Sequence, residues 1–97
     1  LLGVIMVSKL VVLNTKDEKM LERALKMDAE LLLMQDAVLF TNNRIEENNK
    51  LAAHKVYAVK RDDVKRGLSD RMLDTVELVD MDQLVDLLFS GKSVVNL

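Results

Sequence analysis

The sequence offers few side chains that could carry out covalent chemistry. It contains no cysteine and a single histidine, His54. A disulfide, a thiolate metal site and a catalytic thiol are therefore excluded, and no serine stands at a recognisable motif spacing from His54 to complete a catalytic triad. We interpret His54 as a surface or interface residue, and we predict no catalytic residue and no metal site in these 97 residues.

One carboxylate stands where chemistry often occurs in α/β proteins. Asp36 follows the apolar stretch ELLLMQ at 30–35, which has the length and composition of a buried strand. An aspartate at a strand end can accept a phosphoryl group when an acidic pair beside it binds a metal, but the matching pair after the first predicted strand is missing. The alternative interpretation is that Asp36 caps the helix that follows.

Four polar residues come directly after two of the predicted strands: Gln35, Asp36, Lys60 and Arg61. Open parallel sheets bind their ligands beyond the carboxyl ends of the strands. We therefore predict a partner or ligand surface at these four residues. A loop that holds phosphate needs closely spaced glycines, and the three glycines here are scattered along the chain, so we predict no nucleotide and no other cofactor.

These residues depend on strands and helices that alternate along the chain. Four stretches are apolar over the length of a strand and are predicted as strands: 4–13, 30–35, 55–59 and 75–79. The stretches between them are predicted as helices: 16–27, 36–53 with an interruption, and 61–66. A last helix is predicted between Asp80 and Gly91, and residues 93–97 are expected to form a short edge strand or to pack loosely.

Local signals mark where these helices begin and end. Thr15 stands three residues before Glu18, the spacing of a capping box, and Asp80 stands at the same distance from Gln83. Gly67 follows the short helix predicted at 61–66, and glycine is the residue that most easily takes the left-handed conformation after a helix. We therefore predict helix starts near Thr15 and Asp80, and a helix end at Gly67.

Strands that alternate with helices at this spacing predict right-handed crossovers and a parallel sheet. We expect an α/β fold with a small open, mostly parallel sheet of four to five strands and helices on both faces. A chain of this length forms one core, so we expect a single domain over 1–97. Residues 1–5 precede Met6, an alternative start of the native chain.

Charge and composition argue against binding to nucleic acid and against a membrane-spanning segment. The 14 Lys and Arg residues are balanced by 16 Asp and Glu residues, so we expect no direct binding to nucleic acid. The apolar stretch at 1–7 is too short to span a membrane, and the expected location is the cytoplasm. Basic residues between 55 and 66 alternate with two aspartates, and we interpret them as a solvated helix face. We expect most of the six methionines to fill the core, although some could line a contact surface.

Three stretches resemble a known family: LLLMQDAV at 31–38, KVYAVKRDDVKRGL at 55–68 and VELVDMDQLVDLL at 76–88. Together with the first predicted strand, they resemble the TusB/DsrH family of sulfur-relay subunits. That family has a leucine-rich strand ending in Gln-Asp-Gly/Ala-Val, a Lys-Val-Tyr-Ala strand followed by Arg-Gly, and a closing strand with Asp before the last helix. The resemblance extends from Met6 to about Leu88.

The resemblance implies a DsrE/DsrF/DsrH-like fold and assembly with TusC/TusD-like or DsrE/DsrF-like subunits. It also implies a role in tRNA wobble-uridine 2-thiolation or in cytoplasmic sulfur trafficking. Some DsrH-type members carry a cysteine, and this chain agrees with the TusB-like members that do not. We therefore expect a non-catalytic subunit of an oligomer. The alternative is a stand-alone, homo-oligomeric binding domain with the same fold.

Overall fold

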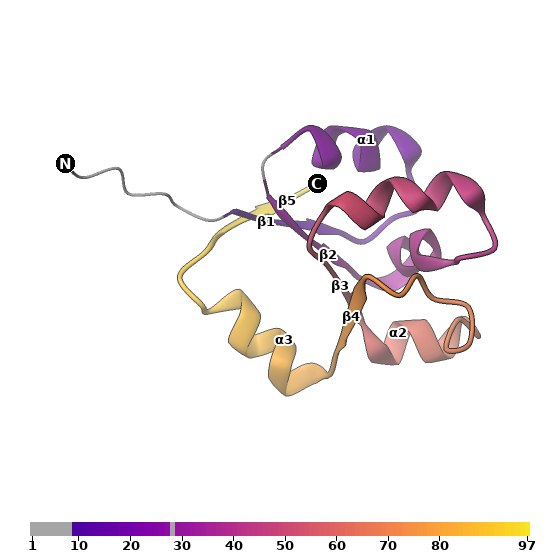
Figure 1. The fold of residues 1–97 in the computed structure, drawn as a ribbon. Helices are drawn as coiled ribbons and strands as arrows, with labels where there is room; N and C mark the ends of the chain where they lie inside the picture. The colour runs from indigo at the N-terminus through magenta and orange to yellow at the C-terminus, as the bar shows by residue number, and fades with distance from the viewer. Residues whose placement is uncertain (1–8, 28) are drawn as a thin grey trace.

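The computed structural model describes residues 9–27 and 29–97 and contains one five-stranded sheet (Figure 1). All of its strand pairs are parallel, and the spatial order is β4-β3-β2-β1-β5. Its strands are β1 (Lys9–Leu13), β2 (Glu30–Leu33), β3 (Val56–Val59), β4 (Val76–Val79) and β5 (Ser93–Asn96). The expected open α/β sheet is confirmed, and residues 93–96 form the edge strand rather than loose packing.

Helices connect the strands and cover both faces of the sheet (Figure 1). Three of the helices in the described ranges are α-helices and two are 3-10 helices: α1 (Glu18–Lys26), η1 (Gln35–Thr41), η2 (Glu46–Ala53), α2 (Lys60–Lys65) and α3 (Met81–Leu88). α1, η1 and η2 pack on one face, where Leu21, Val38 and Leu51 are fully buried. α3 packs on the other face through Leu84.

The strands are apolar on both faces because both are covered. In β1, Val11 and Leu13 join the core under α1, while Leu10 and Val12 join the core on the α3 side. Successive side chains of a strand point to opposite faces, so continuous apolar runs are what a sheet buried on both faces requires. This explains why the apolar segments predict the central strands correctly.

Two helix boundaries test the capping predictions. At α3, the Asp80 carboxylate accepts from the Gln83 backbone N–H at 2.8 Å and the Gln83 side chain accepts from the Asp80 N–H, so this capping box is confirmed. At α1 the prediction of Thr15 is wrong, because the Asp17 carboxylate caps the helix by accepting from the N–H groups of Lys19 and Met20. Aspartate is as strong a cap as threonine, and it stands closer to the apolar stripe.

The predicted interrupted helix at 36–53 is instead a pair of 3-10 helices, and no side chain in the described part of the chain caps the start of either. Within and between them, side chains bond to the backbone: the Thr41 hydroxyl donates to the Val38 carbonyl, and the Asn48 amide donates to the Asn42 carbonyl. Such bonds compete with α-helical hydrogen bonds. The polar residues 42–44 therefore lie between two tight, short helices.

Within the described residues, the first predicted strand is confirmed as β1 over Lys9–Leu13. The predicted strand residues 4–8 and the alternative start at Met6 lie outside the described residues. Gly67 has φ +67° and follows Arg66, the residue that ends α2, so the predicted glycine at the helix end is confirmed. In the part of the chain that the structure describes, no helix is long and apolar enough to cross a membrane.

Candidate functional site

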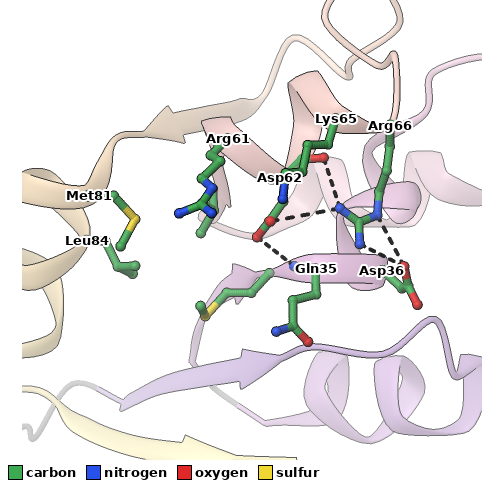
Figure 2. Close-up of a pocket in the computed structure, with 10 residues that line it drawn as sticks. Gln35, Asp36, Arg61, Asp62, Lys65, Arg66, Met81 and Leu84 are labelled. Carbon is green, nitrogen blue, oxygen red and sulfur yellow. Dashed lines mark hydrogen bonds and ion pairs between the residues drawn. The ribbon is translucent and has the colours of Figure 1, made fainter.

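A half-open cavity of about 440 Å³ lies at the carboxyl ends of β2 and β3 (Figure 2). It is lined by residues from η1, α2, α3 and the strand ends: Met34, Gln35, Asp36, Val59, Arg61, Asp62, Lys65, Arg66, Met81 and Leu84. β3 passes without a loop into α2, and Asp80 alone separates β4 from α3. These two short connections bring both helices to the same edge as the start of η1, which encloses the cavity.

The structure brings three of the four predicted surface residues together. Gln35, Asp36 and Arg61 line the cavity, whereas Lys60 lines a neighbouring groove between α2 and α3. The strand order reverses beside β1, where β5 returns to the sheet, so the cavity does not lie at the usual ligand-binding switch point of such sheets. A functional role for the four residues stays a prediction.

Asp36 does not cap the helix that follows, so that interpretation is wrong. η1 begins after Met34, and no side chain of the described residues caps it. Instead, Arg66 at the end of α2 donates through Nη2 and Nε to Asp36 Oδ1, at 2.9 and 3.2 Å. The same guanidinium donates to the Asp62 carbonyl at 3.2 Å and lies 3.8 Å from the Asp62 carboxylate. The Asp36 side chain therefore links η1 to α2.

Gln35 has an unusual backbone. Its φ of +49° lies in the left-handed region, which costs a residue with a Cβ atom roughly 1–2 kcal/mol. Its N–H donates to Asp62 Oδ2 at 2.8 Å, and this bond across 27 residues helps to hold the conformation. Strained residues cluster at functional sites, and Gln35 stands at the rim of the cavity.

The charges around the cavity are unequally paired. The two carboxylates, Asp36 and Asp62, are engaged by Arg66. Arg61 and Lys65 have no carboxylate of residues 9–27 or 29–97 within 4.0 Å. In Figure 2, Arg61 lies on the side of α2 that faces Met81 and Leu84. The cavity therefore offers two cations beside an apolar wall, which suits an anionic group.

None of the ten lining residues carries a thiol, a hydroxyl or an imidazole. The single histidine, His54, is half-buried at the end of η2 and is not among the lining residues. No three acidic or histidine side chains gather as a metal site within the described ranges. The cavity can bind an anion, but it offers no sulfur nucleophile.

Sequence reasoning missed Asp62, Lys65 and Arg66 by assigning them to a solvated helix face. The available signal was their spacing, because Arg61 and Lys65 are four residues apart and Asp62 and Arg66 are also four apart. Residues four apart lie on the same side of a helix. The first pair faces the cavity and has no carboxylate partner among the described residues. The second pair ties α2 to η1, because Arg66 bonds to Asp36 and Asp62 accepts from the Gln35 N–H.

The neighbouring Asp63 is fully buried between α2 and η1. Its Oδ1 lies 3.3 Å from the Thr41 hydroxyl, and its Oδ2 has no hydrogen-bond partner among the described residues. Burial raises the pKa of the Asp63 carboxyl, and the contact with Thr41 opposes that shift only in part. Asp63 lies beside the cavity but does not line it.

The amino edge of the sheet carries a second polar cluster. The Tyr57 hydroxyl donates to Glu30 Oε1 at 3.1 Å, and Lys92 Nζ lies 2.7 Å from Glu30 Oε2. Lys55 and Lys92 both lie over the Tyr57 ring, with Nζ 5.1 and 5.8 Å from its centre. Burial, followed by the bond to Glu30, raises the pKa of Tyr57 to about 12. We call these four residues the amino-edge cluster.

Comparisons with known proteins agree with this architecture. The crystal structure of the YchN protein from E. coli matches the fold with a TM-score of 0.64 and 20% sequence identity, covering 94% of this chain and 100% of that protein. No sequence among the curated proteins matches the chain. A family model described as DsrH like protein matches residues 12–94, which confirms the resemblance noted in the sequence. This chain belongs to the DsrH-like family, and its membership associates it with sulfur relay.

Proposed function

We propose that this chain is a non-catalytic subunit of a sulfur-relay complex. The complex would serve 2-thiolation of the tRNA wobble uridine or cytoplasmic sulfur trafficking. The observation that carries the proposal is that a DsrH-like chain has no cysteine in its 97 residues. The cavity at the carboxyl edge therefore has no thiol in its lining.

Sulfur relay requires a thiolate at each acceptor. The acceptor thiolate attacks the terminal sulfur of a donor persulfide, a new sulfur–sulfur bond forms, and the donor cysteine leaves as a thiolate. No side chain of this sequence can take the acceptor role. The persulfide would therefore be carried by a DsrE- or TusD-like subunit, and this chain would assemble with that subunit and a DsrF- or TusC-like one.

The test is sulfur labelling of isolated and assembled subunits. A cysteine desulfurase and ³⁵S-labelled cysteine are incubated with this chain alone, with the DsrE-like and DsrF-like proteins of the same genome, and with all three. The proteins are then separated on a non-reducing gel. We expect label on the DsrE-like protein and none on this chain, and we expect the three proteins to elute together in size exclusion.

A variant that carries a thiol provides the positive control. Arg61 is exposed and has no ion-pair partner among the described residues, so Arg61→Cys places a thiol at the cavity with little disturbance to the fold. Label on this variant shows that the assay detects a persulfide at this site. Stable label on the unmodified chain would refute the proposal. Failure to assemble with either partner would favour the stand-alone homo-oligomer.

A further inference from the structure

A second hollow lies beside the cavity, between α2 and α3. It has a volume of about 410 Å³ and is lined by six residues: Lys60, Arg61, Val64, Lys65, Asp80 and Met81. We call it the α2–α3 groove. Its floor is formed by apolar parts of these side chains, and both helices that form it follow the carboxyl ends of strands.

Apolar side chains remain exposed at this groove. Val64 is 56% exposed and Met81 is 52% exposed. Val85 and Phe89 follow Met81 at intervals of four residues, and Phe89 is 83% exposed. Four of the six large hydrophobic side chains exposed in the described part of the chain therefore belong to α2, to α3 or to the residue that ends α3.

The described part of the chain leaves this apolar surface uncovered. α3 buries Leu84, and Leu87 and Leu88 partly, against the sheet. At roughly 100° of rotation per residue, Met81, Val85 and Phe89 extend that apolar stripe around the helix, so that apolar residues occupy more than half of its circumference. A helix that packs only on one sheet needs a narrower stripe, and contiguous exposed apolar residues mark interaction sites.

The charged side chains at the groove that are free to pair with a ligand or partner are all positive. Lys60, Arg61 and Lys65 have no carboxylate within 4.0 Å among the residues that the structure describes. Asp80 is the only acid in the lining, and its carboxylate is engaged in the capping box of α3. An occupant that places carboxylates against the three cations therefore complements the groove, whereas a basic occupant does not.

We propose that the α2–α3 groove docks an acidic, amphipathic segment of the neighbouring relay subunit. Apolar side chains of the segment cover Val64 and Met81, and its carboxylates pair with Lys60, Arg61 and Lys65. The proposal rests on the proposed function, because that function supplies the neighbouring subunit. It adds the surface through which the subunit binds and the chemistry of the segment that binds there.

Binding measurements with substituted chains test the proposal. The purified DsrE-like and DsrF-like proteins are titrated with the unmodified chain, with Val64→Ser/Met81→Ser, and with Lys60→Glu/Lys65→Glu. We expect each double variant to raise the Kd about tenfold or more, since anchoring side chains at an interface contribute at this scale. Raised salt should weaken binding of the unmodified chain more than that of the Lys60→Glu/Lys65→Glu variant.

Matched substitutions on the other face provide the controls. Ile45→Ser removes an exposed apolar side chain at the start of η2, and Lys16→Glu/Lys26→Glu reverses two exposed charges near α1. Both should leave the Kd unchanged. Circular dichroism and thermal melting check that every variant folds. We expect all of them to fold, because substitutions at exposed positions change stability little.

The outcomes separate the two proposals. Equal binding of the unmodified chain and both groove variants would overturn the docking site while leaving the sulfur-relay role in place. Absence of any complex with the unmodified chain would overturn both. If the groove variants instead dissociate a homo-oligomer and no partner subunit binds, the occupant is a second copy, and the assignment to a relay subunit is wrong.

Discussion

The amino and carboxyl edges of the sheet differ in how many of their charged side chains are paired with one another. At the amino edge, Glu30 of β2 bonds both to the Tyr57 hydroxyl of β3 and to Lys92, which directly precedes β5. At the carboxyl edge, Arg66 engages both carboxylates, while Arg61 and Lys65 have no partner among the described residues. One edge satisfies its own polar groups, and the other leaves cations available at a cavity.

This difference indicates which edge stabilises the fold and which is available for binding. Paired groups around a buried aromatic ring add to the free energy of unfolding, because their removal leaves a hole and an unpaired charge. Unpaired exposed cations contribute little to stability. Substitutions at the amino-edge cluster should therefore destabilise the protein, whereas substitutions of Arg61 and Lys65 should affect only what binds there.

The largest effect is expected at Tyr57. Tyr57→Ala should lower the free energy of unfolding by about 3–5 kcal/mol, because it removes a buried ring from the core on the α3 side of the sheet and leaves Glu30 without the Tyr57 donor. Urea denaturation measures the change. Tyr57→Phe, which keeps the ring and loses the hydroxyl, should cost about 1 kcal/mol. Similar values for the two variants would show that packing at this edge contributes little.

At the carboxyl edge, the strongest single contribution is expected from Arg66. Arg66→Ala should lower the free energy of unfolding by about 1 kcal/mol, because the ion pair between α2 and Asp36 of η1 and the pair with Asp62 within α2 are both lost at a partly exposed site. Asp36→Asn keeps an oxygen for Arg66 and should cost less. A loss as large as that of Tyr57→Ala, measured in the same urea series, would contradict the distinction between the edges.

Asp63 should make the stability of the protein depend on pH, and its substitution should stabilise the fold, unlike substitution of Tyr57 or Arg66. Its folded-state pKa is raised by burial, so the folded state binds more protons than the unfolded state, and stability falls as the pH rises above about 4. The Thr41 hydroxyl has one hydrogen and lies closer to the Val38 carbonyl than to Asp63, which leaves an ionised Asp63 poorly satisfied.

Asp63→Asn should therefore stabilise the protein by about 0.5–1 kcal/mol at neutral pH, and it should flatten the decline in stability between pH 4 and 7. Urea midpoints across that pH range measure both effects. An unchanged pH profile would show that Asp63 does not titrate differently in the folded state. A lower midpoint at pH 7 would show that the carboxylate has a stabilising partner.

The smallest effect on stability is expected at Arg61. Arg61→Ala should change the free energy of unfolding by less than about 0.5 kcal/mol, because the exposed side chain has no ion-pair partner in the described residues. The same variant should weaken binding to the relay subunits. Thermal melting and titration of the same sample measure both. A clear loss of stability would show that Arg61 belongs to the fold.

The fold was predictable because its signals are local. Continuous apolar runs identify strands covered on both faces, and the Asp80–Gln83 spacing identifies the start of α3. The details of the site were not predictable for a physical reason. Asp36 bonds to Arg66 thirty residues away, and the left-handed Gln35 is held by Asp62. Only the folded chain brings these pairs together, and no glycine signals the left-handed position.

Hydrogen exchange of the assembled complex shows which edge of the sheet the partner subunits cover, because it reports protection along the whole chain. The chain is exchanged alone and with the DsrE-like and DsrF-like proteins. We expect added protection in peptides over 59–66 and 80–90, which contain α2 and α3, and no change over 30–33 and 54–57 at the amino edge. Protection confined to the amino-edge peptides would contradict the assignment of the carboxyl edge as the binding surface.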